Sequence, residues 1–187
     1  MKVTYVNNWS SFDLEKEAAE ALIADGCVLI SQHSDTTGPA TACEAKGVPM
    51  VGYNISMTSV APNQALTSAS IDWAPYVTYA TKCVLEGEEI VVDWCKGYAD
   101  GADKITELNE KVIAAGTADK VAEVEAAIKN GTLHVFDTTT WTVDGAHLDS
   151  YKDDFGNEYI SDGYFHESEL ASAPAFNIII DGVTATK

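Results

Sequence analysis

The first third of the sequence alternates predicted strands and helices, and this order limits the fold more than any other feature. The β-branched run Val3–Val6 precedes a helix predicted over Phe12–Ala24, followed by a strand at Cys27–Ser31, a short helix at Pro39–Ala45 and a strand at Val48–Tyr53. Because parallel strands need helical crossovers, this order predicts an α/β protein with a parallel, doubly wound sheet. The apolar residues expected to face the core from the first helix are Leu14, Ala18, Ala21 and Leu22.

Beyond residue 64 the pattern is less regular, and the chain is expected to form two regions. Residues 1–140 form the α/β region, and residues 141–187 add a hairpin, an acidic loop and a final strand that pack on the same domain. The elements predicted here are helices over Asp72–Leu85 and Ala118–Lys129, strands over Ile90–Cys95 and Phe176–Ile180, a hairpin turn at Asp144-Gly145 and a surface loop over Asp149–Asp162.

The charged residues restrict the kind of ligand. All eleven positive residues are lysines, no arginine is present, and the net charge is −18. Phosphate and carboxylate groups are commonly held by the guanidinium fork, and nucleic acids need a basic patch, so nucleic-acid binding is disfavoured. The expected ligand is neutral or cationic, although acidity that only keeps the chain soluble is the alternative explanation.

Cysteine spacing and hydropathy exclude further classes. The four cysteines, at positions 27, 43, 83 and 95, match no zinc-binding spacing, so no metal is expected, and pairing of Cys83 with Cys95 depends on the compartment. The apolar stretches fall far short of the roughly 20 residues that span a bilayer. Met1-Lys2 leads directly into a strand-like run, so we expect no secretory signal in this chain.

Polar and aromatic residues follow each of the three strands predicted in the first third. The carboxyl ends of parallel strands lie along one edge of a sheet, where ligands bind. An aromatic face with amide and carboxylate groups suits a neutral, partly flat molecule, whereas the alternative is that these loops only cap the strands. The residues are Asn7, Asn8 and Trp9, then Gln32, His33 and Asp35, then Asn54, Ser56 and Met57.

An enzyme is the competing hypothesis for the same strand ends. His33 and Asp35 form an H-x-D pair that would suit a base and its orienting group, within a Rossmann-like or flavodoxin-like fold, although such pairs more often hydrogen-bond within a loop. The sequence contains no G-x-S-x-G elbow and no phosphate-binding G-x-x-x-x-G-K-[ST] loop. We therefore predict no catalytic residues and no cofactor.

Several motifs resemble one family closely. These are "QHSD", "GYNISMTSVAP", "SIDWAPY" and "WCKGYADG", and the similarity continues through "GTLHVFDTTTWTVDG" and "FHESELASAPAF". Together they resemble the basic membrane protein family of bacterial ABC-transporter substrate-binding lipoproteins, which are related to the purine nucleoside receptor. The resemblance implies a lobe of a type I periplasmic-binding fold, without catalysis, whose solute is commonly a purine nucleoside or base.

The resemblance also implies a set of ligand-binding residues. Trp9 would stack on a base and Asp35 would accept hydrogen bonds from the ring or sugar. Ser11 and Ser56 stand where family members often have aspartate, which changes the acceptors offered to sugar hydroxyls. The implied ligand-binding residues are Trp9, Asp35, Asn54, Ser56, Trp73, Gly97 and Gly101.

The resemblance further implies partners and a location. Family proteins carry a lipoprotein signal, a first lobe and the opening strand and helix of the second lobe ahead of the point that matches Met1, so this chain corresponds to roughly the second half. The whole protein would be anchored outside the cytoplasm and would deliver its solute to an ABC transporter permease. We expect the isolated chain to self-associate over an exposed apolar face. An interaction domain with a vestigial cleft is a third hypothesis.

Overall fold

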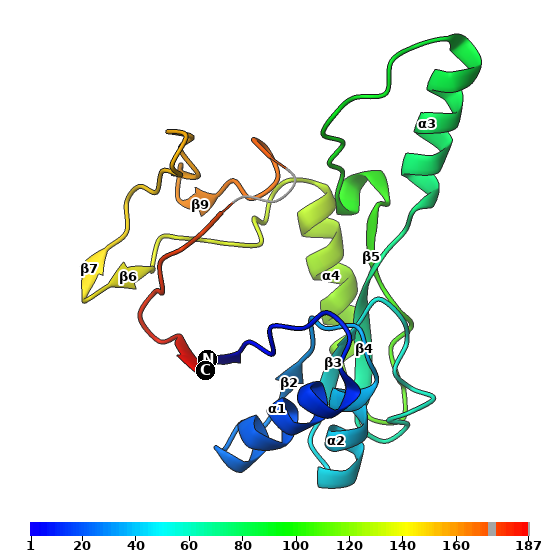
Figure 1. The fold of residues 1–187 in the computed structure, drawn as a ribbon, viewed down its shortest axis with the longest axis vertical. Helices are drawn as coiled ribbons and strands as arrows, with labels where there is room; N and C mark the ends of the chain where they lie inside the picture. The colour runs from blue at the N-terminus through cyan, green and yellow to red at the C-terminus, as the bar shows by residue number, and fades with distance from the viewer. Residues whose placement is uncertain (172–174, 187) are drawn as a thin grey trace. The chain divides into compact units, whose positions relative to one another are not determined.

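The computed structural model describes residues 1–171 and 175–186, so Lys187 and part of the FHESELASAPAF motif lie outside the described residues. The chain forms two compact units (Figure 1). The first comprises Met1–Ile71, Asp103–Val121 and Thr184–Lys187, and the second comprises Asp72–Ala102 and Ala122–Val183. The division into regions 1–140 and 141–187 stays a prediction.

A four-stranded sheet forms the centre of the first unit. Its strands are ordered β2-β3-β4-β5, with β2 at Ile30–Ser31, β3 at Met50–Tyr53, β4 at Ala65–Ile71 and β5 at Asp103–Ile105. The first three strands run parallel and β5 is an antiparallel edge strand. The predicted α/β class with a parallel sheet is therefore confirmed.

Two helices cover one face of this sheet (Figure 1). Helix α1 spans Phe12–Ala24 and helix α2 spans Gly38–Lys46, and the two pack against each other. Small residues allow the close approach, because a Cβ atom on Gly38 would lie 2.4 Å from the backbone oxygen of Phe12. The core between the helices and the sheet consists of Ile30, Ala40, Cys43, Met50, Met57, Ala61 and Ala65.

The buried stripe of α1 differs from the predicted one by one position. Glu15 and Ala19 are the buried residues of the helix, whereas Leu14 and Ala21 are exposed. The shift follows from hydrogen bonds that retain the Glu15 carboxylate inside the unit. The spacing of apolar residues along a helix cannot predict a buried carboxylate that is held by hydrogen bonds.

Strand β1 at Lys2–Thr4 does not join the four-stranded sheet, contrary to the prediction. It pairs in parallel with β10 at Thr184–Thr186, so the two termini lie side by side (Figure 1). Threonine hydroxyls favour this pairing, since Thr4 and Thr186 hydrogen-bond to each other and the Thr186 hydroxyl also donates to the Val3 carbonyl at 3.1 Å. Lys2 is held by an ion pair with Asp25.

The second unit contains the later helices and two hairpins. Helix α3 spans Ala74–Glu86, close to its predicted bounds, and α4 at Thr117–Lys129 runs from the first unit into the second. A short 3-10 helix, η1, spans Tyr98–Asp100. The hairpins pair β6 at Thr142–Val143 with β7 at Ala146–His147, and β8 at Ile160–Ser161 with β9 at Tyr164–Phe165.

Hairpin turns and an aromatic cluster organise the C-terminal part of the second unit. Asp144 and Gly145 both have positive φ at the predicted turn, and Asp162 and Gly163 repeat this geometry. The predicted surface loop Asp149–Asp162 is wrong at its end, because β8 begins there and packs in the core. The clustered side chains are Tyr159, Ile160 and Phe165, with Trp141, Leu148, Tyr151 and Phe176 against them.

Two predicted strands are absent from the described residues. Ile90–Cys95 is a loop, in which the Val91 N–H donates to the Tyr79 hydroxyl at 3.0 Å. Phe176–Ile180 has no ladder partner, because Phe176 packs in the aromatic cluster and the last strand is β10.

Among the described residues, no helix is long and apolar enough to cross a bilayer.

Substituting Gly38→Ala tests the contact between α1 and α2. Alanine favours a helix by up to about 1 kcal/mol over glycine, but the added Cβ would overlap a backbone oxygen and force the helices apart. We expect the free energy of unfolding to fall by about 1 to 2 kcal/mol, measured by denaturant titration. Glu17→Ala on the exposed face of α1 is the control, and a G38A variant as stable as E17A would contradict the proposed packing.

Candidate functional site

The ends of β2 and β3 carry the polar residues predicted to bind a ligand. Because these strands are parallel neighbours, their carboxyl ends lie at the same edge of the sheet. The His33 ring stacks on Tyr53 with centroids 4.7 Å apart and planes at 20°, which joins the two strand ends. His33, Asp35, Asn54 and Ser56 are all exposed at this edge.

The buried Gln32 shapes the loop that carries Asp35. Its side-chain nitrogen donates to the carbonyl oxygens of Ser34 at 2.7 Å and Thr36 at 2.6 Å. Its side-chain oxygen is also buried and has no hydrogen-bond partner among the described residues. The amide thus fixes the turn after β2 from inside, so Asp35 projects from a defined loop.

Glu15, which sequence reasoning did not select, ties this loop to helix α1. The side chain is only 2% exposed. Its Oε1 accepts the Ser11 N–H at 3.1 Å, and Oε2 accepts both the Thr36 N–H at 3.0 Å and the Thr36 hydroxyl at 2.7 Å. Burial alone would raise the pKa of Glu15, but hydrogen bonds from Thr36, Ser34 and the backbone outweigh it and lower the pKa below the ordinary value.

A cavity of about 910 Å³ adjoins these residues within the first unit. It is lined by Met1–Trp9 on one side and Gly26–Ser34 on the other, together with residues of α1 and Pro39. Trp9, Asn8 and Gln32 therefore line one cavity, although β1 does not belong to the four-stranded sheet as the strand-end hypothesis expects. A cavity of this size is ample for a nucleoside or a sugar.

Left-handed backbone conformations mark two of the strand ends. Asn7 has φ of +50° just after β1, and Asn54 has φ of +67° just after β3. Asparagine adopts this conformation more readily than other residues with a side chain. At Asn54 the turn is fixed by two hydrogen bonds, from its own N–H to Ala69 at 2.7 Å and from the Ser70 hydroxyl to its carbonyl at 2.7 Å.

The structure brings some of the predicted residues together and leaves others separate. Trp9 is 83% exposed and lines the cavity, whereas Asp35, Asn54 and Ser56 lie outside the lining. The Ser56 hydroxyl pairs with that of Thr58 at 2.9 Å. Trp73, Gly97 and Gly101 belong to the second unit, where Gly101 ends η1 with φ of +76°.

The histidine and aspartate of the enzyme hypothesis do not form a pair. His33 stacks on Tyr53, and no hydrogen bond joins it to Asp35. The four cysteines are free thiols, and burial raises the pKa of Cys43 to about 11, so that thiol is unreactive at neutral pH. Among the described residues no group of three histidine, cysteine or acidic side chains is arranged to hold a metal ion.

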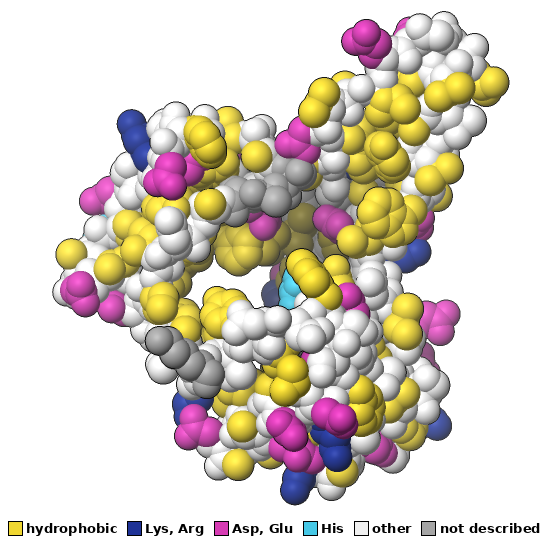
Figure 2. Space-filling model, viewed as in Figure 1, with side chains coloured by type: hydrophobic (Ala, Val, Ile, Leu, Met, Phe, Trp, Pro, Cys, Tyr) yellow, Lys and Arg dark blue, Asp and Glu magenta, His cyan; other side chains and the backbone are white. Residues whose placement is uncertain are grey.

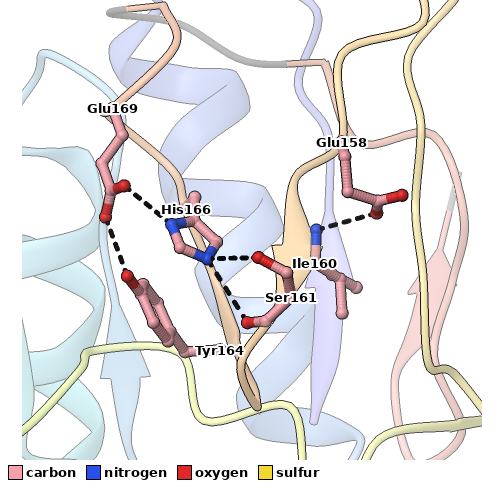
Figure 3. A network of polar contacts seen from close by, with 6 residues as sticks. All are labelled: Glu158, Ile160, Ser161, Tyr164, His166 and Glu169. Atoms are coloured by element: carbon pink, nitrogen blue, oxygen red, sulfur yellow. Dashed lines mark hydrogen bonds and ion pairs between the residues drawn. The ribbon is translucent and has the colours of Figure 1, made fainter.

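A second polar network lies in the β8–β9 hairpin (Figure 3). His166 is hydrogen-bonded to the Ser161 hydroxyl at 2.8 Å and to the Glu169 carboxylate at 2.7 Å. The hydrogen bond between Glu169 and His166 lowers the pKa of the Glu169 carboxylate. The Tyr164 hydroxyl also donates to that carboxylate, at 3.2 Å. Ser161 does not line the cavity of the first unit, nor a second cavity of about 330 Å³ whose lining includes Trp94. We therefore assign the network to stabilising the β8–β9 hairpin.

Comparison with known proteins identifies the family. Residues 1–139 match the model of the ABC transporter substrate-binding protein PnrA-like family. The chain belongs to this family. It is 32% identical over 137 residues to a purine-binding protein of Brucella abortus, and 30% identical over 135 residues to a putative ABC transporter glucose-binding protein of Haloferax volcanii. These alignments cover 73% and 72% of the chain but only 38% and 34% of the two relatives.

A solved structure supports the fold of this PnrA-like chain. An ABC transporter solute-binding protein from Aeropyrum pernix superposes with a TM-score of 0.54 at 20% sequence identity. The match covers 73% of this chain and 47% of the other. The family is one of substrate-binding proteins, and the predicted periplasmic-binding-protein-like lobe is confirmed as the fold class.

Acid unfolding tests the role of Glu15. Because its pKa is lower in the folded chain than in the unfolded chain, ionised Glu15 stabilises the fold above the usual carboxyl range, and this contribution is lost as the pH falls through the lowered pKa. In a Glu15→Gln variant the amide nitrogen cannot accept a hydrogen bond. We expect the free energy of unfolding at pH 7 to drop by about 1 to 3 kcal/mol and its dependence on pH below about 5 to weaken.

The matched control is Glu17→Gln, an exposed carboxylate on the same helix. It should leave both the stability at pH 7 and the acid limb of the profile near those of the unmodified chain. A Glu15→Gln variant that keeps the full acid dependence would contradict the assignment.

Proposed function

We propose that this chain is the part of an ABC-transporter receptor that contributes one lobe of the solute site, with a purine nucleoside or base as the solute. The observation that carries the proposal is the 32% identity to a purine-binding protein, together with a cavity that includes Trp9 at the strand ends. An exposed indole offers a stacking face for a flat base. The amides and carboxylate nearby offer hydrogen-bond partners to its polar edge.

The proposed roles rest on the family resemblance and on the exposure of these side chains at the strand ends, where Trp9 lines the cavity and the others lie outside its lining. Trp9 stacks on the base, and Asp35 accepts hydrogen bonds from a sugar hydroxyl or a ring N–H. Asn54 and Ser56, exposed at the next strand end, contact the same solute. Trp73, Gly97 and Gly101 stay predicted contacts in the second unit.

Charge favours a nucleoside or base over a nucleotide. The two charged side chains of the cavity, Lys2 and Glu15, are both engaged, Lys2 with Asp25 and Glu15 with Ser11 and Thr36. No arginine is available to bind a phosphate, and the chain carries a net charge of −18. We therefore expect phosphorylated forms of the solute to bind more weakly than the uncharged forms.

A sugar is the second candidate solute, because a relative of 30% identity is named a putative glucose-binding protein. Sugars also stack on indole rings and hydrogen-bond to carboxylates and amides. A purine nucleoside or base contains a flat aromatic ring, and a sugar does not. A binding screen that includes both classes of solute therefore distinguishes the two candidates.

Location and partners of the whole protein are part of the same proposal. Members of this family serve ABC transporters, so the protein that contains this chain would act outside the cytoplasm as an anchored lipoprotein and deliver its solute to a permease. The chain would contribute binding and no chemistry.

Calorimetry and thermal unfolding test the proposed solute. Adenosine, guanosine, hypoxanthine, glucose and adenosine monophosphate are compared, and a ligand at 100 times its dissociation constant should stabilise the fold by about 2.7 kcal/mol. We expect a nucleoside or base to bind and the monophosphate to bind less. Asp35→Asn should weaken nucleoside binding by roughly 10- to 100-fold, because a charge-assisted hydrogen bond is lost.

Asp13→Asn, which removes an exposed carboxylate from the first turn of α1, is the matched control and should bind as the unmodified chain does. Trp9→Ala should abolish most of the binding by removing the stacking face. Glucose binding without nucleoside binding would replace the purine assignment with the sugar one, and binding unchanged in both Trp9 and Asp35 variants would refute the proposed site.

We also propose that isolated chains self-associate through the free edge of β2. Within the described part of the chain that strand pairs only with β3, toward which the N–H groups of Ile30 and Gln32 point. Because strand backbones alternate, the polar groups of Leu29 and Ser31 face the unpaired edge, and both residues also line the cavity of the proposed solute site, so self-association and solute binding would compete. Val28 beside this edge is 81% exposed, and an apolar strand edge is a template for pairing with another chain.

Light scattering over a range of concentrations tests this edge. We expect dimers or larger species in the unmodified chain and mainly monomers in Val28→Lys, because a lysine on an edge opposes pairing. Leu85→Lys, at an equally exposed position on α3, is the control and should still associate. A monomer at every concentration would exclude the interface.

A further inference from the structure

The second unit contains an aromatic cavity apart from that of the first unit, and one of the predicted solute contacts, Trp73, belongs to its lining. It measures about 330 Å³ and is lined by Trp73, Tyr76, Val91, Val92, Asp93 and Trp94. Trp73 is the N-cap residue of α3, Tyr76 lies in the first turn of that helix, and the loop after α3 supplies the others. Figure 2 shows hydrophobic side chains gathered over the part of the surface where Figure 1 places α3.

The aromatic rings are arranged as adjoining walls. Trp94 meets Tyr76 edge to face, with centroids 5.3 Å apart and planes at 63°. Trp94 also stacks with Tyr79, with centroids 6.3 Å apart and planes at 24°, and the Tyr79 hydroxyl accepts the Val91 N–H at 3.0 Å. The loop that carries Trp94 is therefore held against α3 by both rings and a hydrogen bond, which fixes the corner of the cavity.

The remaining walls determine which ligand the cavity suits. Trp73 is 64% exposed, so much of its ring is open to a ligand. Asp93 adds a carboxylate, and the lining contains no lysine or histidine. Aromatic faces carry negative potential, and together with a carboxylate they attract a cation that has a diffuse charge and an apolar surface.

We propose that this cavity binds an organic ammonium ion, with a quaternary methylammonium group between Trp73, Tyr76 and Trp94. Such a group is only weakly hydrated, so it gives up little hydration when it contacts aromatic rings, whereas a small inorganic cation needs several oxygen ligands. The net charge of −18 adds a long-range attraction for any cation. The proposal is independent of the purine or sugar site in the first unit.

A pair of probes with the same shape separates charge from hydrophobicity. Choline carries a trimethylammonium group, and 3,3-dimethylbutan-1-ol replaces that group with an uncharged tert-butyl group. Titration is followed by calorimetry and by the NMR signals of the probe. We expect saturable binding of choline and at least about tenfold weaker binding of the alcohol, as the cation–π contribution predicts. Equal binding of the two probes, or no saturable binding of choline, would overturn the proposal.

Variants of the walls locate the site. Trp94→Leu keeps an apolar wall and removes the aromatic face, so choline affinity should fall by about fivefold or more while the weak binding of the alcohol changes little. Phe155→Ala removes an exposed aromatic ring that is not in the lining and is the matched control. Unchanged choline affinity in Trp94→Leu, with circular dichroism showing a folded chain, would also overturn the proposal.

Two cross-checks keep this proposal distinct from the solute proposal. Trp9→Ala should bind choline as the unmodified chain does, and Trp94→Leu should retain any nucleoside binding. If choline is displaced by a nucleoside in competition, the two ligands share one site and the separate ammonium site is refuted. If nucleosides do not bind at all, the choline titration still decides the ammonium site by itself.

Discussion

The buried carboxylate of Glu15 is the contact on which the geometry of the first unit depends. It accepts three hydrogen bonds, one from the chain entering α1 and two from Thr36 in the loop after β2. A buried carboxylate that lost these donors would be strongly unfavourable, so helix and loop are fixed together. Gly38 then begins α2 in contact with the backbone of α1, which places the second helix beside the first.

Features encoded within a short stretch of sequence were predictable. Helices α1, α3 and α4 lie close to their predicted bounds, because apolar periodicity and a glycine or an Asp-Gly stop are local signals. Strand pairing is not local. The β-branched run near Val3 predicts a strand, and a strand forms there, yet its partner lies at the opposite end of the chain, in β10. Ile90–Cys95 has the composition of a strand, but the Trp94 contacts with Tyr76 and Tyr79 hold it as a loop.

The candidate site was predictable as an edge and not as a set of contacts. The rule that parallel strands end together placed His33 near Tyr53 and Asn54, and the stacked rings agree with it. Glu15, which shapes the edge from inside, is not among the predicted residues, because a polar residue in a helix usually faces water. Gln32 is among the predicted strand-end residues, but its side chain is buried and holds the loop instead of facing solvent. Glu15 stands four residues before Ala19, so the two side chains lie on one face of α1. This spacing was the available sequence signal that Glu15 faces the core, where both residues are buried.

The absence of arginine has different consequences in the two units. In the first, the Lys2 side chain is paired with Asp25 and the Glu15 carboxylate already accepts hydrogen bonds from Ser11 and Thr36, so we expect the ligand there to be uncharged. In the second, Asp93 stands among aromatic rings whose potential has the same sign as its charge, which favours a cation. The chain has no arginine to offer a fork of donors to an anion, which is why we expect phosphorylated solutes to bind more weakly. These charges are the physical basis on which we propose a nucleoside, and not a nucleotide, as the solute.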